Sequence, residues 1–357
     1  MACPWKTIRL IPKDIEEEFE MKNIMFFPLW FLQLFGTAKS FQHNPIIGNP
    51  TLNRAGLHVV RVVLSHAMTN LRWWLMSPLI PRHQRKAYRE QGYLVIRDFL
   101  PGDQFAKLKA ELKKYSGEVR ECIQGNTLTL HGMLDREATD RHPECGAFTK
   151  DKRLSRLMMY CGAKMRQPLY FVSCIKNGYT DAGADPQKTL HRDTFHPTMK
   201  AWLFIDDVND ENGPFNYVPG SQRLSWARLK WEYRHSVTGA ELPTPYEQRG
   251  SFRITKTMLA TLGLKDATAF DVPGNTLVIA NTNGFHYRGS APRSSRMALY
   301  AYSRSNPFMP FPGIGLPPVA WVERFITKKY FEHEDKKASA RGKRSSWHLV
   351  PSPKLQK

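Results

Sequence analysis

The chain contains few cysteines and no long hydrophobic run, and these absences exclude several classes of protein. Its five cysteines are odd in number and include no CxxC pair, which argues against a disulfide framework and a zinc ribbon. The most apolar run, residues 24–35, has twelve residues, whereas a membrane-spanning helix needs about 20. The first residues lack the apolar core of a secretory signal. We therefore expect a protein of a reducing, cytoplasmic compartment that does not cross a membrane.

Acidic residues are scarce in this chain, and one long stretch contains none. Of its 357 residues, 52 are Lys or Arg and 32 are Asp or Glu, so the formal net charge is +20 at pH 7. The stretch from Lys39 to Arg89 has no Asp or Glu but eight Lys or Arg residues. A field of this sign attracts anions such as nucleic acid, acidic lipid headgroups or phosphorylated substrates. Hydrophobic residues make up 41%, which excludes wholesale disorder.

The composition divides the chain into three regions. We expect a basic region of amphipathic helices over residues 1–82, the main domain over residues 83–326, and a polar, basic, mobile tail over residues 327–357. Apolar residues recur at steps of three and four over residues 53–76 and predict a helix. Its basic residues, with Trp73 and Trp74 near its end, are typical of a helix on a membrane surface. Alternatively, its apolar face packs on the domain behind it.

The main domain has the pattern of an antiparallel β fold. A helix, a short strand over Tyr93–Ile96 and a helix from about Asp103 are predicted first. Short runs rich in β-branched and aromatic residues follow and are bounded by Pro-Gly, Asn-Gly and Gly-Pro turns. These runs are residues 168–176, 200–206, 215–218, 275–281 and 296–303. Because no βαβ alternation is present, the pattern predicts a mainly β fold, a jelly roll or barrel, with flanking helices.

Two segments of the β-rich region carry residues suited to metal chemistry. His191 and Asp193 are two residues apart, so on a strand they point to the same face and can bind one metal. His286, 93 residues after Asp193, would complete a 2-His-1-carboxylate triad, which leaves metal positions open for O2 chemistry. Arg296 follows ten residues later and can hold a carboxylate with two hydrogen bonds. Together these features indicate a 2-oxoglutarate-dependent oxygenase.

The stretch DDVNDENGPFNYVPGS, residues 206–221, resembles the acidic turn, Gly-Pro and Pro-Gly-Ser of the phytanoyl-CoA dioxygenase family. The resemblance runs from about Gly92 to Ser305. It implies a double-stranded β-helix, a cupin-like jelly roll, with an N-terminal helical extension. It also implies a hydroxylase that uses Fe(II), 2-oxoglutarate and O2. By this resemblance the metal ligands are His191, Asp193 and His286, and the residues near 2-oxoglutarate are Arg296, Trp202 and Lys176.

Three further residues are candidates for binding an anionic substrate. Arg192 and His196 lie next to the predicted metal ligands in the sequence. Arg288 stands two residues after the distal histidine, where the family usually has a small residue, so it would add a cation at the pocket mouth. A segment that we expect to act as a lid contains His131, Asp135 and Arg136.

The substrate is open among three hypotheses. The first is an anionic, lipid-linked sugar acid at the cytoplasmic face of the inner membrane. The layout of the chain resembles bacterial hydroxylases of 3-deoxy-manno-octulosonic acid (Kdo), a sugar acid of lipopolysaccharide. The second is a soluble small molecule or acyl-CoA, which leaves the aromatic N-terminal region unexplained. The third, a nucleic-acid-directed oxygenase or binding module, is permitted by the charge, but no recognition motif accompanies it.

Overall fold

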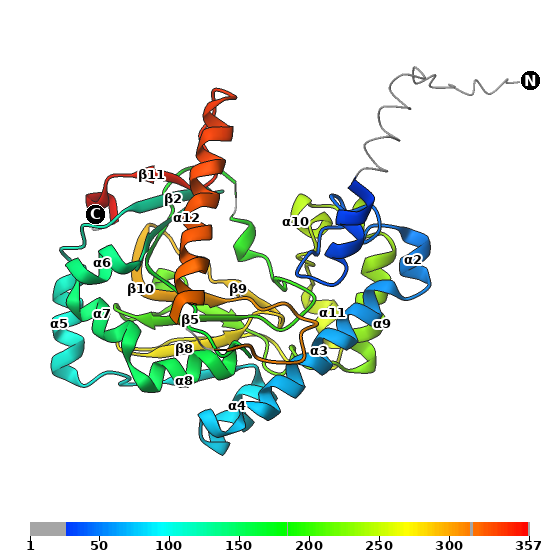
Figure 1. Ribbon diagram of the computed structural model, residues 1–357, viewed down its shortest axis with the longest axis horizontal. Helices are drawn as coiled ribbons and strands as arrows, with labels where there is room; N and C mark the ends of the chain where they lie inside the picture. The colour runs from blue at the N-terminus through cyan, green and yellow to red at the C-terminus, as the bar shows by residue number, and fades with distance from the viewer. Residues whose placement is uncertain (1–25, 184, 315–316, 356–357) are drawn as a thin grey trace, which may run out of the picture.

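Two antiparallel β-sheets form the centre of the molecule (Figure 1). The computed structural model describes residues 26–183, 185–314 and 317–355. Residues 1–25, part of the predicted N-terminal region 1–82, lie outside the described residues. In spatial order, the larger sheet contains β1 (Tyr93–Ile96), β8 (Leu277–Asn281), β5 (Met199–Phe204), β10 (Ser294–Ser303), β4 (Leu169–Asn177), β3 (Thr127–Met133), β2 (Val119–Gln124) and β11 (His348–Val350). The smaller sheet contains β7 (Thr268–Ala269), β6 (Phe215–Tyr217) and β9 (His286–Arg288).

Helices flank these sheets on both sides of the view in Figure 1. They are α2 (Pro50–Arg54), α3 (Leu57–Leu75), α4 (Arg82–Gln91), α5 (Gly102–Leu112), α6 (Arg136–Arg141), α7 (Pro143–Lys150), α8 (Lys152–Cys161), α9 (Trp226–Val237), α10 (Pro245–Gln248), α11 (Lys256–Thr261) and α12 (Pro317–Ser339). The architecture confirms the predicted jelly roll with flanking helices and N-terminal helices. The predicted strand Tyr93–Ile96 is β1, and the predicted helix from about Asp103 is α5.

The alternation of side chains along β5 separates the core from the inner face of the larger sheet. Ala201 and Leu203 belong to the large core cluster, which also contains residues of α5, α7 and α8. Trp202 and Phe204 point the other way, toward Phe215 of the smaller sheet. The inner face between the two sheets is therefore where side chains from several strands meet.

The N-terminal helix differs from the prediction in its bounds and in its orientation. Gly56 has a φ of 99°, which interrupts the helix predicted over residues 53–76 and leaves α2 and α3. The polar side of α3 is buried, including Arg61 and Arg72. Its apolar side is exposed, with Trp74 69% exposed. The alternative that the apolar side packs on the domain is therefore wrong. No helix among the described residues is long and apolar enough to span a bilayer.

Over the residues described, the C-terminal region contains regular secondary structure and joins the larger sheet. It contains α12, and β11 pairs with β2 in the larger sheet. Arg120 of β2 bonds to Asp335 over 2.8 Å and to the carbonyl of Trp347 over 2.9 Å. The polar composition of this segment suggested a solvated tail. In the structure, polar side chains such as Asp335 instead attach the segment to the sheet.

Candidate active site

Three residues from separate elements bring their ligand atoms to one point. His191, Asp193 and His286 each offer a ligand atom, and these atoms lie within 4.8 Å of one another. His286 begins β9 and is paired with His191 through an isolated β-bridge. The Nε2 atoms of both histidines lie 3.7 Å from Oδ1 of Asp193. This arrangement matches a 2-His-1-carboxylate metal site.

The hydrogen bonds of the two imidazoles aim their free nitrogens at the same point. Nδ1 of His191 is 2.6 Å from the carbonyl oxygen of Thr189, and Nδ1 of His286 is 2.9 Å from that of Gly284. Each Nδ1–H therefore donates to a carbonyl, which leaves the Nε2 lone pair for a metal. Nε2 of His191 is buried and has no hydrogen-bond partner among the described residues.

The protonation states at this centre also suit a cation. Burial, together with the neighbouring His286, holds the pKa of His191 well below its usual range. Burial likewise lowers the pKa of His286, so both rings are neutral ligands at neutral pH. Burial opposes ionisation of Asp193, but Lys200 and the two imidazoles hold the pKa of this carboxyl well below its usual range. The site thus offers one negative and two neutral ligands, as Fe(II) sites of this type do.

A small cavity of about 80 Å³ adjoins the two histidines. Successive inward positions of β5 contribute Lys200, Trp202 and Phe204 to its wall. Arg288 and Arg296 also line it, from β9 and β10. Burial and the neighbouring Arg288 guanidinium lower the pKa of Arg296 to about 9. Arg296 has no ion-pair partner among the described residues, so an anion would stabilise it, and the cavity fits the carboxylate end of 2-oxoglutarate.

Arg288 has a different position from the one expected. It lines this smaller cavity, and its Nη1 lies 2.7 Å from Oδ2 of the buried Asp185. Lys176 does not reach the smaller cavity at all. Ile175 of β4 faces Arg296 and lines the cavity, so the next residue, Lys176, points to the opposite face of the strand. Its Nζ donates to the carbonyl of Lys354 over 2.8 Å, which corrects its expected role beside 2-oxoglutarate.

A larger cavity of about 470 Å³ lies on the other side of Asp193. It shares Asp193 with the metal centre and Lys200 with the smaller cavity. Tyr300 and Tyr302 line it from the same strand, β10, that places Arg296 in the smaller cavity. Because these three residues are at even spacing, they share one face of β10. Strand β10 therefore lines both cavities, and the metal ligands lie between the two cavities.

The C-terminal segment forms part of the wall of the larger cavity. The imidazole of His131 lies between two aromatic rings, with centroid distances of 4.6 Å to Trp347 and 5.2 Å to Tyr300. Phe331 of α12 also lines the cavity. His131 and Asp135, which were expected in a lid, do line the cavity, from β3 and from the N-cap of α6. Arg136 is exposed on α6 and lies 3.7 Å from Asp140, outside the cavity wall.

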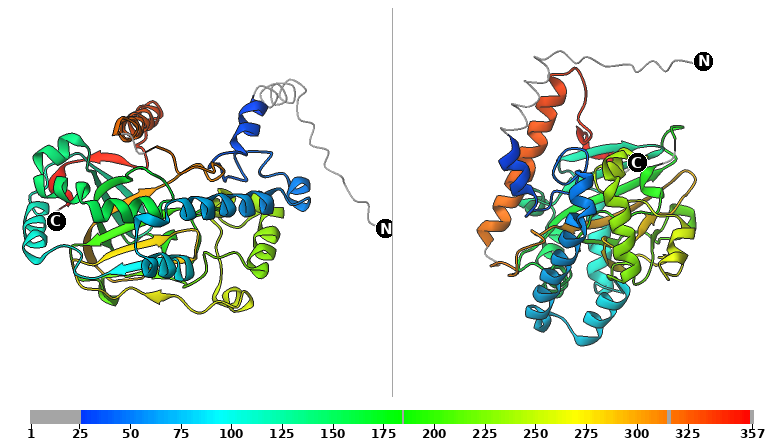
Figure 2. Two further views of the ribbon diagram at one scale, coloured as in Figure 1. Left: turned by 60° about the horizontal axis from the view of Figure 1, so that its bottom comes forward. Right: turned by 90° about the vertical axis from the view of Figure 1, so that its right-hand side faces the viewer.

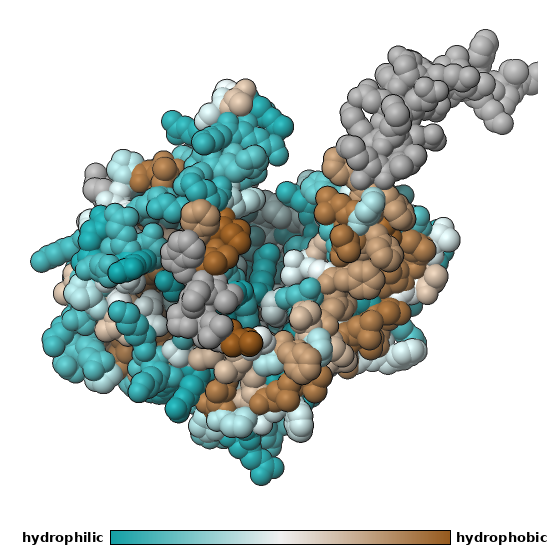
Figure 3. Space-filling model, viewed as in Figure 1, coloured by the Kyte–Doolittle hydropathy of each residue, from teal (hydrophilic) through white to brown (hydrophobic). Residues whose placement is uncertain are grey.

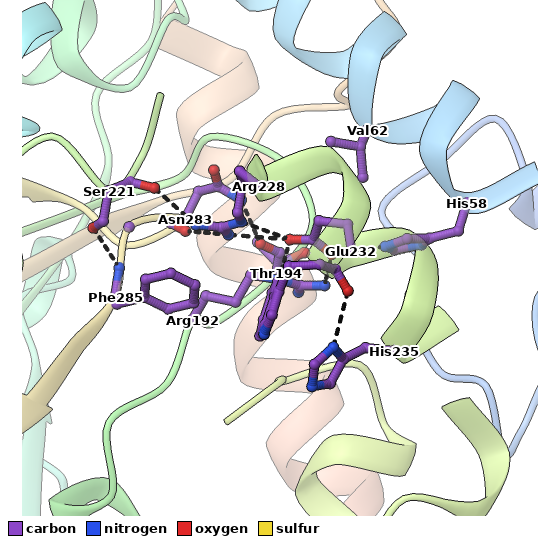
Figure 4. Close-up of polar contacts among 12 residues, drawn as sticks. His58, Val62, Arg192, Thr194, Ser221, Arg228, Glu232, His235, Asn283 and Phe285 are labelled. Carbon is purple, nitrogen blue, oxygen red and sulfur yellow. Dashed lines mark hydrogen bonds and ion pairs between the residues drawn. The ribbon is translucent and has the colours of Figure 1, made fainter. Parts of the chain in front are cut away.

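Arg192 and His196, expected near a substrate, line neither of the two cavities. Arg192 is 0% exposed and points away from the cavities, where it forms two hydrogen bonds with the buried Glu232, of 2.8 Å and 2.6 Å (Figure 4). Arg228 and His58 bond to the same carboxylate. His196 is 2% exposed and lines neither cavity. Alternation explains Arg192: because His191 and Asp193 point toward the metal, the residue between them points the opposite way.

Two lysines of the site were missed by the sequence analysis. Nζ of Lys200 lies 2.6 Å from Oδ2 of Asp193. Lys39 belongs to the N-terminal region, and its Nζ donates to the backbone carbonyl of Asp193. The position of Lys200 on the predicted strand two residues before Trp202 was a usable signal. No spacing or motif connects Lys39 with a residue 154 positions later in the chain.

The family match now has a structural context. Residues 88–254 match the family model described as phytanoyl-CoA dioxygenase (PhyH). Over this range the chain is similar to the phytanoyl-CoA dioxygenase family. The matched range contains His191 and Asp193, and the fold brings His286 and Arg296 to them from beyond its end. The protein is a non-haem Fe(II)/2-oxoglutarate-dependent oxygenase. When bound, Fe(II) and 2-oxoglutarate supply the activation of O2, and the protein supplies ligands, orientation and an enclosed cavity.

Several solved structures are similar to this oxygenase. The alpha-ketoglutarate-dependent epimerase SnoN from nogalamycin biosynthesis is 17% identical, with 63% of this chain and 82% of that chain covered and a TM-score of 0.42. HygX from Streptomyces hygroscopicus, with nickel and 2-oxoglutarate bound, is 15% identical, with 63% and 88% covered and a TM-score of 0.38. EctD from S. alaskensis, with 2-oxoglutarate and 5-hydroxyectoine, is 14% identical, with 64% and 80% covered and a TM-score of 0.40. No curated protein matches the chain.

Proposed function

We propose that this oxygenase hydroxylates an anionic, lipid-linked sugar acid, such as Kdo of lipopolysaccharide or lipid A, at the cytoplasmic face of the inner membrane. The supporting observation is the cavity of about 470 Å³ beside Asp193. This volume falls in the range of small-molecule sites. Its position next to the metal ligand would bring a bound sugar beside the centre that oxidises it.

The charges of the cavity favour an anionic substrate. Arg304 and Lys328 line it, and neither forms an ion pair among the described residues. The other cations of the wall already have partners: Arg120 bonds to Asp335, Arg141 to Glu137 and Lys200 to Asp193. Two unpaired cations remain for the carboxylate or phosphate of a substrate.

The aromatic wall complements a sugar ring. The rings of Tyr300 and Trp347 each stack on the imidazole of His131, and all three residues line the cavity. Burial lowers the pKa of His131 to about 3, so its ring is neutral at neutral pH and adds no charge to this side. Flat apolar faces beside cationic groups are suited to a molecule with carbon–hydrogen surfaces and acidic substituents.

The direct test is oxidation of Kdo2-lipid A. The full-length protein is incubated with Fe(II), 2-oxoglutarate, ascorbate and Kdo2-lipid A, and mass spectrometry measures the addition of one oxygen. We expect one succinate per oxygen added, and neither product with His191→Ala or His286→Ala. Full 2-oxoglutarate turnover by His286→Ala would contradict the metal assignment.

The same assay separates the other substrate classes. Acyl-CoA and free sugar acids are offered in parallel, and salt-sensitive binding of DNA or RNA is measured separately. Oxidation of a soluble acid in preference to the lipid would overturn the proposed substrate and leave the oxygenase assignment intact.

A further inference from the structure

The outer side of α3 is a continuous apolar stripe. Its exposed side chains are spaced by three, four and seven residues, which places them on one side of the helix. The exposed fractions are 54% for Val60, 47% for Leu64, 38% for Leu71, 69% for Trp74 and 42% for Leu75. Helices of globular proteins normally bury such a stripe and expose the charged side. Here the orientation is reversed.

The buried side of α3 holds two loops beside this stripe. Arg61 donates to the carbonyls of Leu34 over 3.0 Å and Ala38 over 2.7 Å. Arg72 donates to the carbonyls of Asn306 over 3.0 Å and Met309. The side chain of Asn306 in turn donates to the carbonyl of Phe35 over 3.0 Å, which ties the two loops together. The two buried arginines of α3 therefore hold these exposed loops in place through hydrogen bonds.

Both loops, and the helical residues before the first of them, add exposed apolar side chains to the same face of the molecule. Figure 3 shows hydrophobic surface gathered over α3 and the residues that precede it. We call this set the docking face: Val60, Leu64, Leu71, Trp74 and Leu75 of α3, with Phe26, Phe27, Phe31, Leu32, Phe35, Met309 and Phe311. Monomeric proteins rarely leave a patch of this kind uncovered unless it binds something.

The charge around the docking face is mostly positive. Residues 26–89 contain no Asp or Glu and eight Lys or Arg, and residues 304–314 contain no acid either. Arg54 lies exposed before α3, and Arg82, Lys86 and Arg89 lie exposed on α4 after it. A second copy of the chain, also with a net charge of +20, would be repelled here. A surface with anionic headgroups over an apolar interior complements both the charge and the exposed apolar stripe.

We infer that the docking face binds an anionic phospholipid bilayer, with α3 lying in the plane of the interface. This inference deepens the proposed function, because it assigns the surface by which the enzyme would reach a lipid-linked substrate. Part of the wall of the larger cavity comes from segments that adjoin this side of the molecule. Arg304 lines the cavity and begins the loop clamped by Arg72, and Lys328 lines it from α12, where Phe325 and Ile326 are exposed.

Vesicle binding tests the inference without any substrate. Full-length protein is sedimented with vesicles of phosphatidylcholine alone or with added phosphatidylglycerol. We expect binding to the anionic vesicles that weakens at high salt. The double variant Leu64→Glu/Trp74→Glu is expected to lose affinity by at least about tenfold, because two inserted apolar side chains are replaced by anions. Both residues are exposed, so folding is expected to survive, which the melting temperature checks.

A matched variant separates the docking face from general effects of added charge. Met258 is 39% exposed on α11, the small yellow helix at the bottom of the left view of Figure 2, whereas the blue residues 26–35 lie near its top. Met258→Glu is therefore expected to bind vesicles like the wild type. Unchanged binding by the double variant, or no binding of wild type to anionic vesicles, would overturn the inference. A wild-type dimer that the double variant dissociates would also overturn it. Vesicle binding without oxidation of Kdo2-lipid A would contradict only the proposed substrate.

Discussion

Arg192 and Glu232 form a buried ion pair directly behind the metal ligands, with 2.6 Å between Nη2 and Oε2. Arg192 is 0% exposed and Glu232 is 1% exposed. Burial alone would raise the pKa of Glu232, but Arg192 and Arg228 hold it well below its usual range. The carboxylate therefore pairs with two arginines inside the protein, and one of these stands between His191 and Asp193 in the chain.

Removal of this carboxylate should affect both stability and metal binding. Glu232→Gln leaves two buried cations without their partner, and we expect the free energy of unfolding to fall by about 3–5 kcal/mol. Because Arg192 adjoins two ligands, we also expect the Mn(II) affinity of the folded variant to fall by about tenfold. Urea denaturation and calorimetric titration measure these quantities, with the exposed Glu241→Gln as control. Wild-type metal affinity in Glu232→Gln would mean that the pair serves stability alone.

The sequence allowed His191, Asp193 and the sheets to be predicted because their signals are local. His191 and Asp193 are two residues apart on an extended segment, and strands with regular alternation predict which residues share a face. The same alternation, applied fully, predicts that Arg192 points away from the metal. The error came from treating nearness in sequence as nearness in space.

The orientation of α3 and the course of the C-terminal segment could not be predicted from local patterns. Periodicity identifies an apolar side on α3 but does not say whether protein or another medium covers it. The decisive contacts are long-range, such as Arg72 with Asn306 and Arg120 with Asp335. Lys39 reaches Asp193 by the same kind of long-range contact, which a single sequence does not encode in any motif.

Arg296 should control the affinity for 2-oxoglutarate. A hydrogen bond to a charged group contributes about 1.5–3 kcal/mol, so Arg296→Ala is expected to raise the KM for 2-oxoglutarate by about 10- to 150-fold. Arg296→Lys keeps the charge but not the paired donors and should recover only part of this loss. Lys176→Ala is the control, because Lys176 faces away from the smaller cavity and should leave this KM unchanged. Equal effects of Arg296→Ala and Lys176→Ala would contradict the placement of the cosubstrate.

Trp347 should act on the substrate but not on 2-oxoglutarate. Its ring stacks on His131 in the wall of the larger cavity, and such aromatic pairs contribute about 0.5–1.5 kcal/mol. We expect Trp347→Ala to raise the substrate KM by about 2- to 10-fold, with unchanged 2-oxoglutarate binding. Leu349→Ala, at an exposed position two residues later, is the matched control. A Trp347→Ala enzyme with wild-type substrate KM would show that the C-terminal segment is not part of the substrate site.

Acid should destabilise the protein through histidines that are buried in the neutral form. Burial, reinforced by Arg228, lowers the pKa of His66 to about 3. In the unfolded chain this histidine titrates near pH 6.5, so between pH 6.5 and 3 the unfolded state binds more protons than the folded state. Each such group therefore removes about 1.4 kcal/mol of stability per pH unit as the pH falls through this window. His196, whose pKa burial also lowers to about 3, acts in the same direction. Urea denaturation of metal-free protein from pH 7.5 to 5 is expected to show this loss, with a shallower slope below pH 6.5 in His66→Gln. An identical slope in that variant would mean that His66 is protonated in the folded protein.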